Sequence, residues 1–308
     1  MRPTVTNSND FAIEGIRAGP HHAKKGTQLL RFSCADFAFP LLERQQSFQL
    51  LHLLGFGYVD LGLFARSRHL SPSELSTSPS RFTNRLKEEL KNADLQVADL
   101  FLQIGVHPAD SAANDPSVMV RAHGRDAFLR SIDLCVALGC SHLTGLPGVF
   151  HEATDPQQDL DLAAEEAIWR TRACTQGNIQ YAIEPHFGSI CQDVASTLSF
   201  LHMAEPLSLT LDYGHFIYTG HSSEEVHALL PVASHVHARG SARGRLQTSV
   251  AENKIDFAGI MHRLRNIQYG SFITLEYVWD EWQSCNRTDN VSETILLWRM
   301  LEAIGRGA

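Results

Sequence analysis

Four apolar runs in the second half of the chain each end in a side chain that can bind a metal ion or carry a proton. The runs are IQYAIE, LSLTLD, SHVH and FITLE, and they end in Glu184, Asp212, His237 and Glu276. A carboxylate at the end of a hydrophobic strand is costly to bury unless a cation accompanies it. Three such carboxylates gathered without a cation would repel one another, and their pKa values would rise.

The residues that lead up to these four side chains alternate in character. Ala182 shares a strand face with Glu184, and Thr210 shares one with Asp212, whereas the bulky aliphatic residues occupy the opposite face. In a barrel, alternate strand residues face the lumen and the surrounding helices. A single acidic residue at a strand end is more often a helix cap, but four equivalent positions favour one shared site. Three carboxylates and one imidazole suit Mn²⁺, Co²⁺, Fe²⁺ or Zn²⁺.

The elements that would position these side chains follow a regular order. Apolar runs occur at 29–34, 58–64, 95–105, 141–148, 179–185, 207–214, 234–239 and 271–279, with amphipathic helical patterns between them and a last one at 292–305. Eight alternations of strand and helix predict an α/β fold, a single (β/α)₈ TIM barrel over residues 28–308. Residues 1–27 are mixed and polar, and we expect an arm that is poorly ordered or covers a partner.

Composition narrows the classes of function. The 308 residues are 44% hydrophobic and carry a formal net charge of −8, which argues against a protein that binds nucleic acid or an anionic membrane surface. The six cysteines form no C-x-x-C pair, as expected in a reducing compartment, and we expect a cytoplasmic location. The 16 histidines make any one of them weak evidence for a site.

Five further residues are candidates for binding a substrate. His215 lies three residues after Asp212, and Arg243 lies six residues after His237. The other three follow predicted strands: His69, His107 and His186. For each of them a structural or solvent-exposed position is the alternative. An arginine is well suited to hold an oxygen-rich substrate.

The chain resembles the xylose-isomerase-like TIM barrels, which include sugar epimerases, inosose dehydratases, hydroxypyruvate isomerases and endonuclease IV. The resemblance covers about residues 29 to 305 and is carried by the segments LGFGYVDLG, YAIEPH, LTLDYGH, HVHARGSARG and IDFAGIMHRLRNIQYGSFITLEYVW. The last of these segments is the most specific.

The resemblance implies roles for individual residues. The family's metal ligands fall on Glu184, Asp212, His237 and Glu276, and in the keto-sugar epimerases the two glutamates also move the proton. His215 and Arg243 match the substrate-contacting residues of that branch. One departure is Gly240, because the family often has an acidic residue three positions after the metal histidine.

We therefore predict a metal-dependent isomerase or epimerase of a sugar, keto-sugar or cyclitol that abstracts a proton next to a carbonyl. It would use one divalent ion, Mn²⁺ first, with Co²⁺, Mg²⁺, Fe²⁺ and Zn²⁺ as alternatives. The competing hypotheses are a dehydratase or eliminase on the same substrates, an endonuclease IV-like phosphodiesterase, and a non-catalytic sugar-binding barrel. A homodimer or homotetramer is common among similar barrels.

Overall fold

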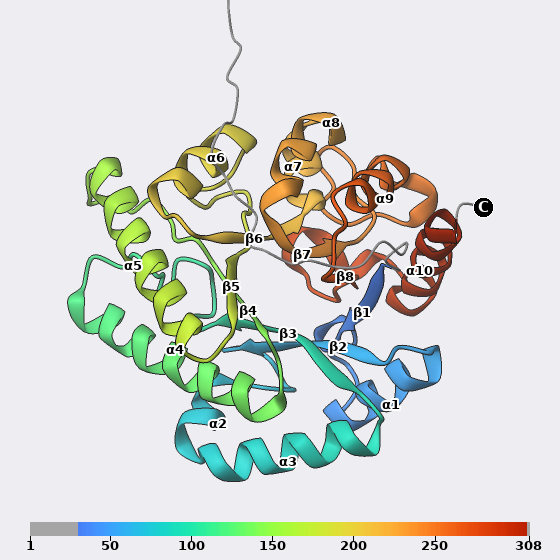
Figure 1. The fold of residues 1–308 in the computed structure, drawn as a ribbon, viewed down its shortest axis with the longest axis horizontal. Coiled ribbons are helices and arrows are strands. Elements are labelled where there is room, and N and C mark those ends of the chain that lie inside the picture. Colours follow the sequence, from blue (N-terminus) through green and yellow to red (C-terminus); the bar gives the residue numbers. More distant parts are fainter. Residues whose placement is uncertain (1–29, 307–308) are drawn as a thin grey trace, which may run out of the picture.

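The computed structural model describes residues 30–306, which form a closed barrel of eight parallel strands (Figure 1). The strands follow one another around the barrel in chain order, and β8 pairs with β1 to close it. They are β1 (Arg31–Ala35), β2 (Tyr58–Phe64), β3 (Gln96–Gln103), β4 (His142–Gly145), β5 (Gln180–Ile183), β6 (Ser208–Asp212), β7 (Ala233–Ala238) and β8 (Phe272–Leu275). The predicted (β/α)₈ barrel is confirmed, whereas the arm predicted over residues 1–27 lies outside the described residues.

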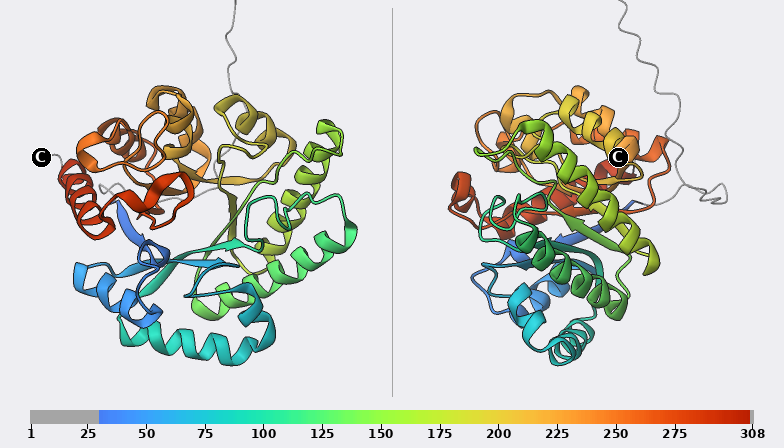
Figure 2. Two further views of the ribbon diagram at one scale, coloured as in Figure 1. Left: turned by 180° about the vertical axis from the view of Figure 1, so that it is seen from behind. Right: turned by 90° about the vertical axis from the view of Figure 1, so that its left-hand side faces the viewer.

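Helices form the outer layer around the strands, as the views in Figure 2 also show. The α-helices are α1 (Arg44–Leu54), α2 (Pro72–Thr77), α3 (Pro79–Asn92), α4 (Val118–Leu138), α5 (Pro156–Gln176), α6 (Val194–Met203), α7 (Tyr213–Thr219), α8 (Ser223–Val226), α9 (Phe257–Asn266) and α10 (Asn290–Arg306). Short 3-10 turns are η1 (Asp36–Ala38), η2 (His227–Val232), η3 (Val250–Glu252) and η4 (Trp282–Arg287). Across residues 30–306, none of the helices combines the length and hydrophobicity that a membrane crossing requires.

Local sequence signals set several helix ends. Gly55 and Gly139 follow α1 and α4 in the left-handed conformation, with φ of 98° and 70°, where glycine avoids the penalty of a side chain. At the other end, the side chains of Ser222 and Asp256 accept hydrogen bonds from the backbone N–H groups at the starts of α8 and α9. These helix boundaries agree with the glycine, serine and aspartate residues that mark helix ends in the sequence.

The strands separate an apolar outer face from a polar lumen. On the outer face of β5, the ring of Tyr181 meets Phe128 of α4 edge to face, with ring centroids 5.2 Å apart. Inside the barrel, the Thr144 and Thr210 hydroxyls are 2.6 Å apart across the lumen. The predicted alternation is therefore confirmed. The six cysteines are free and buried, so they serve as small apolar residues.

Candidate metal centre

The four predicted ligands lie at equivalent places on consecutive strands. Glu184 and Glu276 directly follow β5 and β8, Asp212 ends β6, and His237 lies in β7. Backbone hydrogen bonds from Glu184 to the Gly145 carbonyl (2.9 Å) and from Glu276 to the Ala238 carbonyl (3.0 Å) extend the strand ladder to these positions. Each of the four residues is at most 5% exposed. The strand ladder and burial therefore fix the positions of these residues.

The imidazole of His237 contacts both glutamates through the same ring nitrogen. Its Nδ1 is 2.7 Å from Glu184 Oε1 and 3.4 Å from Glu276 Oε2. One ligand atom from each of these three residues lies within 4.8 Å of the others, and Asp212 forms a second such group with Glu184 and His215. Because Glu184 belongs to both groups, all four predicted ligands meet in one cluster. Asp212 also accepts a hydrogen bond from Gly214 N–H (2.7 Å), so it caps α7 as well.

Arg239 is a member of this cluster that the sequence analysis did not single out. Its guanidinium Nη2 donates to Asp212 Oδ2 at 2.5 Å and lies 3.7 Å from Glu276 Oε2. The residue is only 4% exposed, which is rare for arginine without paired anions. The spacing could have identified it, because Arg239 follows His237 by two residues and therefore takes the next lumen-facing position.

Mutual burial shifts the pKa values of the cluster. Burial and the charge of Glu276 raise the pKa of Glu184 to about 7. Burial also raises the pKa of Asp212, although the Arg239 guanidinium opposes this. For His237, burial is outweighed by the surrounding carboxylates, Glu276 foremost, so its pKa lies well above the usual value. The carboxylates thus hold a positive charge on the imidazole.

A divalent metal ion fits this donor set. The three carboxylates carry three negative charges, and Arg239 carries one positive charge. A divalent ion would balance the remaining two negative charges once His237 is neutral. Metal binding requires that deprotonated imidazole and would release its proton. Glu276 Oε2 is buried without a hydrogen-bond partner, so an acceptor is already free in the cluster. Oxygen-rich shells with one imidazole are typical of Mn²⁺, Fe²⁺, Co²⁺ and Zn²⁺.

Two neutral histidines flank the carboxylates. Burial and the Arg239 charge lower the pKa of His215 well below its usual value, and burial lowers the pKa of His186 to about 4. The Nδ1 of His215 and the Nε2 of His186 have no hydrogen-bond partner although they are buried. Neutral imidazoles can donate at one nitrogen and accept at the other, which suits substrate hydroxyl groups.

An aromatic wall, formed by Phe187, Tyr218 and Trp282, lies beside His215. Phe187 stacks on Trp282 with centroids 5.0 Å apart and an interplanar angle of 6°, and it lies 4.6 Å from the ring of Tyr218. The Tyr218 hydroxyl donates to Gln283 Oε1 at 2.8 Å, which ties α7 to η4. Trp282 is 6.4 Å from the His215 ring. The wall therefore gives one side of the site a flat apolar surface.

The structure places His69 and His107 apart from the carboxylate cluster. His69 is buried, and its Nδ1 contacts Asp36 Oδ2 at 3.0 Å while its Nε2 contacts the Leu42 carbonyl at 2.9 Å. Both ring nitrogens are thus engaged within the protein. His107 is exposed on the loop after β3. Neither residue shares a ligand group with Glu184 in the described part of the chain.

Arg243 also lies outside the cluster in this conformation. It is exposed, and its guanidinium packs over Gly220 at the end of α7, with Nε 3.2 Å from where a Cβ would be. The buried cation among the ligands is Arg239, not Arg243.

Packing explains why position 240 carries no side chain. A Cβ on Gly240 would lie 2.6 Å from the Thr248 carbonyl oxygen and 2.8 Å from the Tyr277 hydroxyl. The Gly240 N–H donates to that same hydroxyl at 3.0 Å. The acidic residue expected here from the resemblance is therefore excluded by the close approach of the 240–249 loop.

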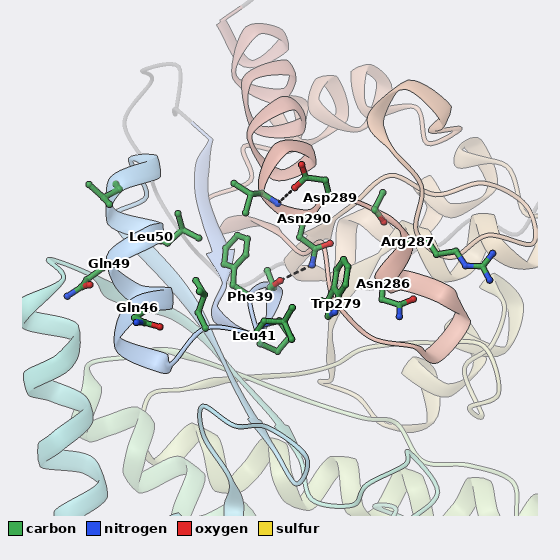
Figure 3. A pocket seen from close by; sticks show the side chains of 16 residues that line it. Phe39, Leu41, Gln46, Gln49, Leu50, Trp279, Asn286, Arg287, Asp289 and Asn290 are labelled. Carbon is green, nitrogen blue, oxygen red and sulfur yellow. Dashed lines mark hydrogen bonds between the residues drawn. The ribbon is translucent and has the colours of Figure 1, made fainter.

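A separate apolar pocket of about 870 Å³ lies between α1 and the segment that joins β8 to α10 (Figure 3). Phe39, Leu41, Leu53, Trp279 and Val291 are among the residues that line it. The side chain of Asn290 donates to the Ala38 carbonyl at 2.8 Å and so links the two walls. None of the four metal-ligand candidates lines this pocket, so it is not the metal centre.

Comparisons with known proteins agree with this fold. A family model described as xylose isomerase-like TIM barrel matches residues 48–301. A structure of L-ribulose 3-epimerase is 18% identical, with a TM-score of 0.71 over 91% of this chain and 97% of that one. D-allulose 3-epimerase from Methylomonas sp. in complex with D-allulose is 15% identical, with a TM-score of 0.71 over 89% and 97%.

The probable 3-DHS dehydratase AsbF from Bacillus anthracis is 16% identical, with a TM-score of 0.65 over 87% of this chain and 99% of that one. At such identities the structural neighbours establish the fold, and they differ in reaction. The search of curated proteins gives no match.

Replacing His69 by alanine should destabilise the fold without involving the metal centre. The change leaves the buried Asp36 carboxylate without its cationic partner, at a cost of about 3 kcal/mol. Burial opposes protonation of His69, but Asp36 outweighs it and the pKa is raised. The stabilisation should therefore be full below about pH 6.5 and fade as the pH rises through the higher folded pKa. His107→Ala, at an exposed position, is the control in chemical denaturation; equal stability of the two variants would contradict the assignment.

Replacing Arg239 by methionine should tighten the binding of a divalent ion to metal-free protein by at least about tenfold. A fixed positive charge within 4 Å of two ligands opposes a second cation, and methionine removes that charge while keeping much of the volume. Titration with Mn²⁺ by calorimetry measures the effect, and Arg243→Met is the matched control. Unchanged or weaker binding in the Arg239 variant would show that the guanidinium does not act on the metal centre.

Proposed function

The chain belongs to the xylose isomerase-like TIM barrel family, and on that basis we propose that it is a divalent-metal-dependent isomerase or epimerase. Its substrate would be a sugar, keto-sugar or cyclitol, and its reaction would begin by removal of a proton next to a carbonyl. One observation carries the proposal: Glu184 and Glu276 both approach His237 Nδ1 in a buried cluster at the carboxyl ends of β5–β8. Enzymes of this fold place their reacting groups at that end of the barrel.

Glu184 and Glu276 would act as a general acid and base pair. Each is fixed at the end of its strand, and the strands carrying them lie on different sides of β6 and β7 in the barrel order. One glutamate can therefore remove the proton from one face of the substrate, and the other can return it on the opposite face. Positioned proton transfer of this kind contributes about 10²- to 10⁴-fold to a rate.

The remaining polar groups would orient the substrate. The unpartnered nitrogens of His186 and His215 can exchange hydrogen bonds with two hydroxyl groups. The free Nε of Arg239 offers a third, charged donor in the same place. The aromatic wall would exclude water from one side. Removal of a proton next to the carbonyl gives an enediolate. A divalent ion held by Glu184, Asp212, His237 and Glu276 would supply the Lewis acidity that stabilises its negative charge.

A dehydratase on the same class of substrates is the second candidate. It is supported by the likeness to the probable 3-DHS dehydratase, and proton abstraction beside a carbonyl begins both reactions. An endonuclease IV-like activity has less support, although a structure named as AP endonuclease, family 2, from Brucella melitensis shares the fold. His69 and His107 lie apart from the cluster, and the net charge is −8.

Deuterium exchange from solvent tests the proposal, because it reports proton abstraction whichever product follows. Mn²⁺-loaded protein should exchange a carbon-bound proton of a keto-sugar or inosose drawn from a small panel. Glu276→Gln and Glu184→Gln should each lower the rate by at least about 100-fold, since an amide cannot accept the proton. Exposed Glu252→Gln is the control for general effects of the substitution.

Retained sugar binding with no exchange by the unaltered protein would favour a non-catalytic binding barrel instead. Exchange that survives both glutamine variants would overturn the roles of the two glutamates but not the reaction class.

A further inference from the structure

A second group of ligand-type side chains lies in the lumen, below the candidate metal centre. It consists of Asp60 on β2, Asp99 on β3, and His235 and His237 on β7. One ligand atom from each lies within 4.8 Å of the others. The four residues are 0 to 1% exposed. His235 precedes His237 by two residues, so the group occupies the next layer of inward-facing side chains.

Each member of this lumen group has a buried atom with no hydrogen-bond partner among residues 30–306. These atoms are Asp60 Oδ1, Asp99 Oδ2, His235 Nδ1 and His237 Nε2. Fully buried polar atoms are normally satisfied, so four in one group call for an occupant. Two carboxylate oxygens and two imidazole nitrogens are a donor set that first-row divalent metals accept.

The other atoms of the group are held by the protein. Asp60 Oδ2 accepts hydrogen bonds from His235 Nε2 at 2.6 Å and from the Thr274 hydroxyl at 2.7 Å. Asp99 Oδ1 lies 2.6 Å from His142 Nδ1, and His142 Nε2 lies 2.8 Å from the Ser234 hydroxyl. Such outer contacts orient ligands in known metal sites.

A divalent ion would also balance the charge of this layer. Asp60 and Asp99 are two carboxylates with no access to solvent. The rings of His142 and His235 are stacked with centroids 5.0 Å apart, so protonating both would place two positive charges in contact. Each carboxylate has a histidine at ion-pair distance, His235 for Asp60 and His142 for Asp99, both at 2.6 Å. A divalent ion would balance the two carboxylates while these histidines stay neutral.

We propose that Asp60, Asp99, His235 and His237 hold a second divalent cation, enclosed in the barrel lumen beneath the catalytic one, with Zn²⁺ as the preferred ion. His237 would then serve both centres as an imidazolate, with Nδ1 facing the upper one and Nε2 the lower one, and binding both ions would release both of its ring protons. The proposal concerns metal content and does not depend on which reaction the upper centre performs.

Metal content of the whole protein tests the proposal. Metal-free protein is dialysed against Mn²⁺ and Zn²⁺, and bound metal is measured by mass spectrometry. The unaltered chain should hold two equivalents, and Asp99→Asn should hold one, since Asp99 touches only the lower group. Asp133→Asn, at an exposed position of α4, is the matched control and should keep two.

A second variant covers the case in which Asp99→Asn fails to fold. The double variant Glu184→Gln/Glu276→Gln weakens only the upper centre and should retain one tightly held equivalent. The proposal would be overturned if the unaltered protein held one equivalent of metal and the double variant held none. Water molecules or shared protons, rather than a metal ion, would then lie between the lumen carboxylates. If the unaltered protein holds two equivalents of metal but shows no deuterium exchange, that result would count against the proposed reaction and not against the second cation.

Discussion

Every carboxylate buried in a closed parallel barrel needs a nearby positive charge. This requirement determines which side chains surround the carboxylates, both at the mouth of the barrel and deeper in its lumen. At the mouth, Glu184, Asp212 and Glu276 share Arg239 and the imidazole of His237. One layer lower, Asp60 and Asp99 rely on histidines and on hydroxyl groups. The apolar packing between strands and helices can be rigid because these charges are matched inside the lumen rather than left to solvent.

Much of the site could be predicted because a strand alternates strictly between two faces. The parity of residues in the last four strands predicted that Glu184, Asp212, His237 and Glu276 lie near one another, and in the structure they fall in two groups that share Glu184. The same rule, continued one residue past the end of β7, reaches Arg239. The lumen group was harder to predict. The register of β2 on β3 shifts between Val59 and Asp60, and the sequence contains no pattern that indicates such a bulge.

Histidines show the limit of reasoning from residue type alone. With 16 in the chain, position after a strand does not separate those that meet the carboxylates from those that serve the fold. His186 and His215 lie beside the cluster, whereas His69 satisfies Asp36 and a carbonyl. The difference depends on which loop folds over which strand end. Gly240 illustrates the same dependence, since contacts with Thr248 and Tyr277 decide what that position can hold.

The stacked pair of Trp282 and Phe187 gives the protein an optical reporter. The indole is 45% exposed at the mouth, close to His215, and η4 carries it on the segment that follows Glu276. Because indole emission is sensitive to water and to neighbouring rings, we expect ligand binding at the mouth to change the fluorescence without any added label. Trp279, 40% exposed beside the apolar pocket, contributes a background, as do Trp169 and Trp298.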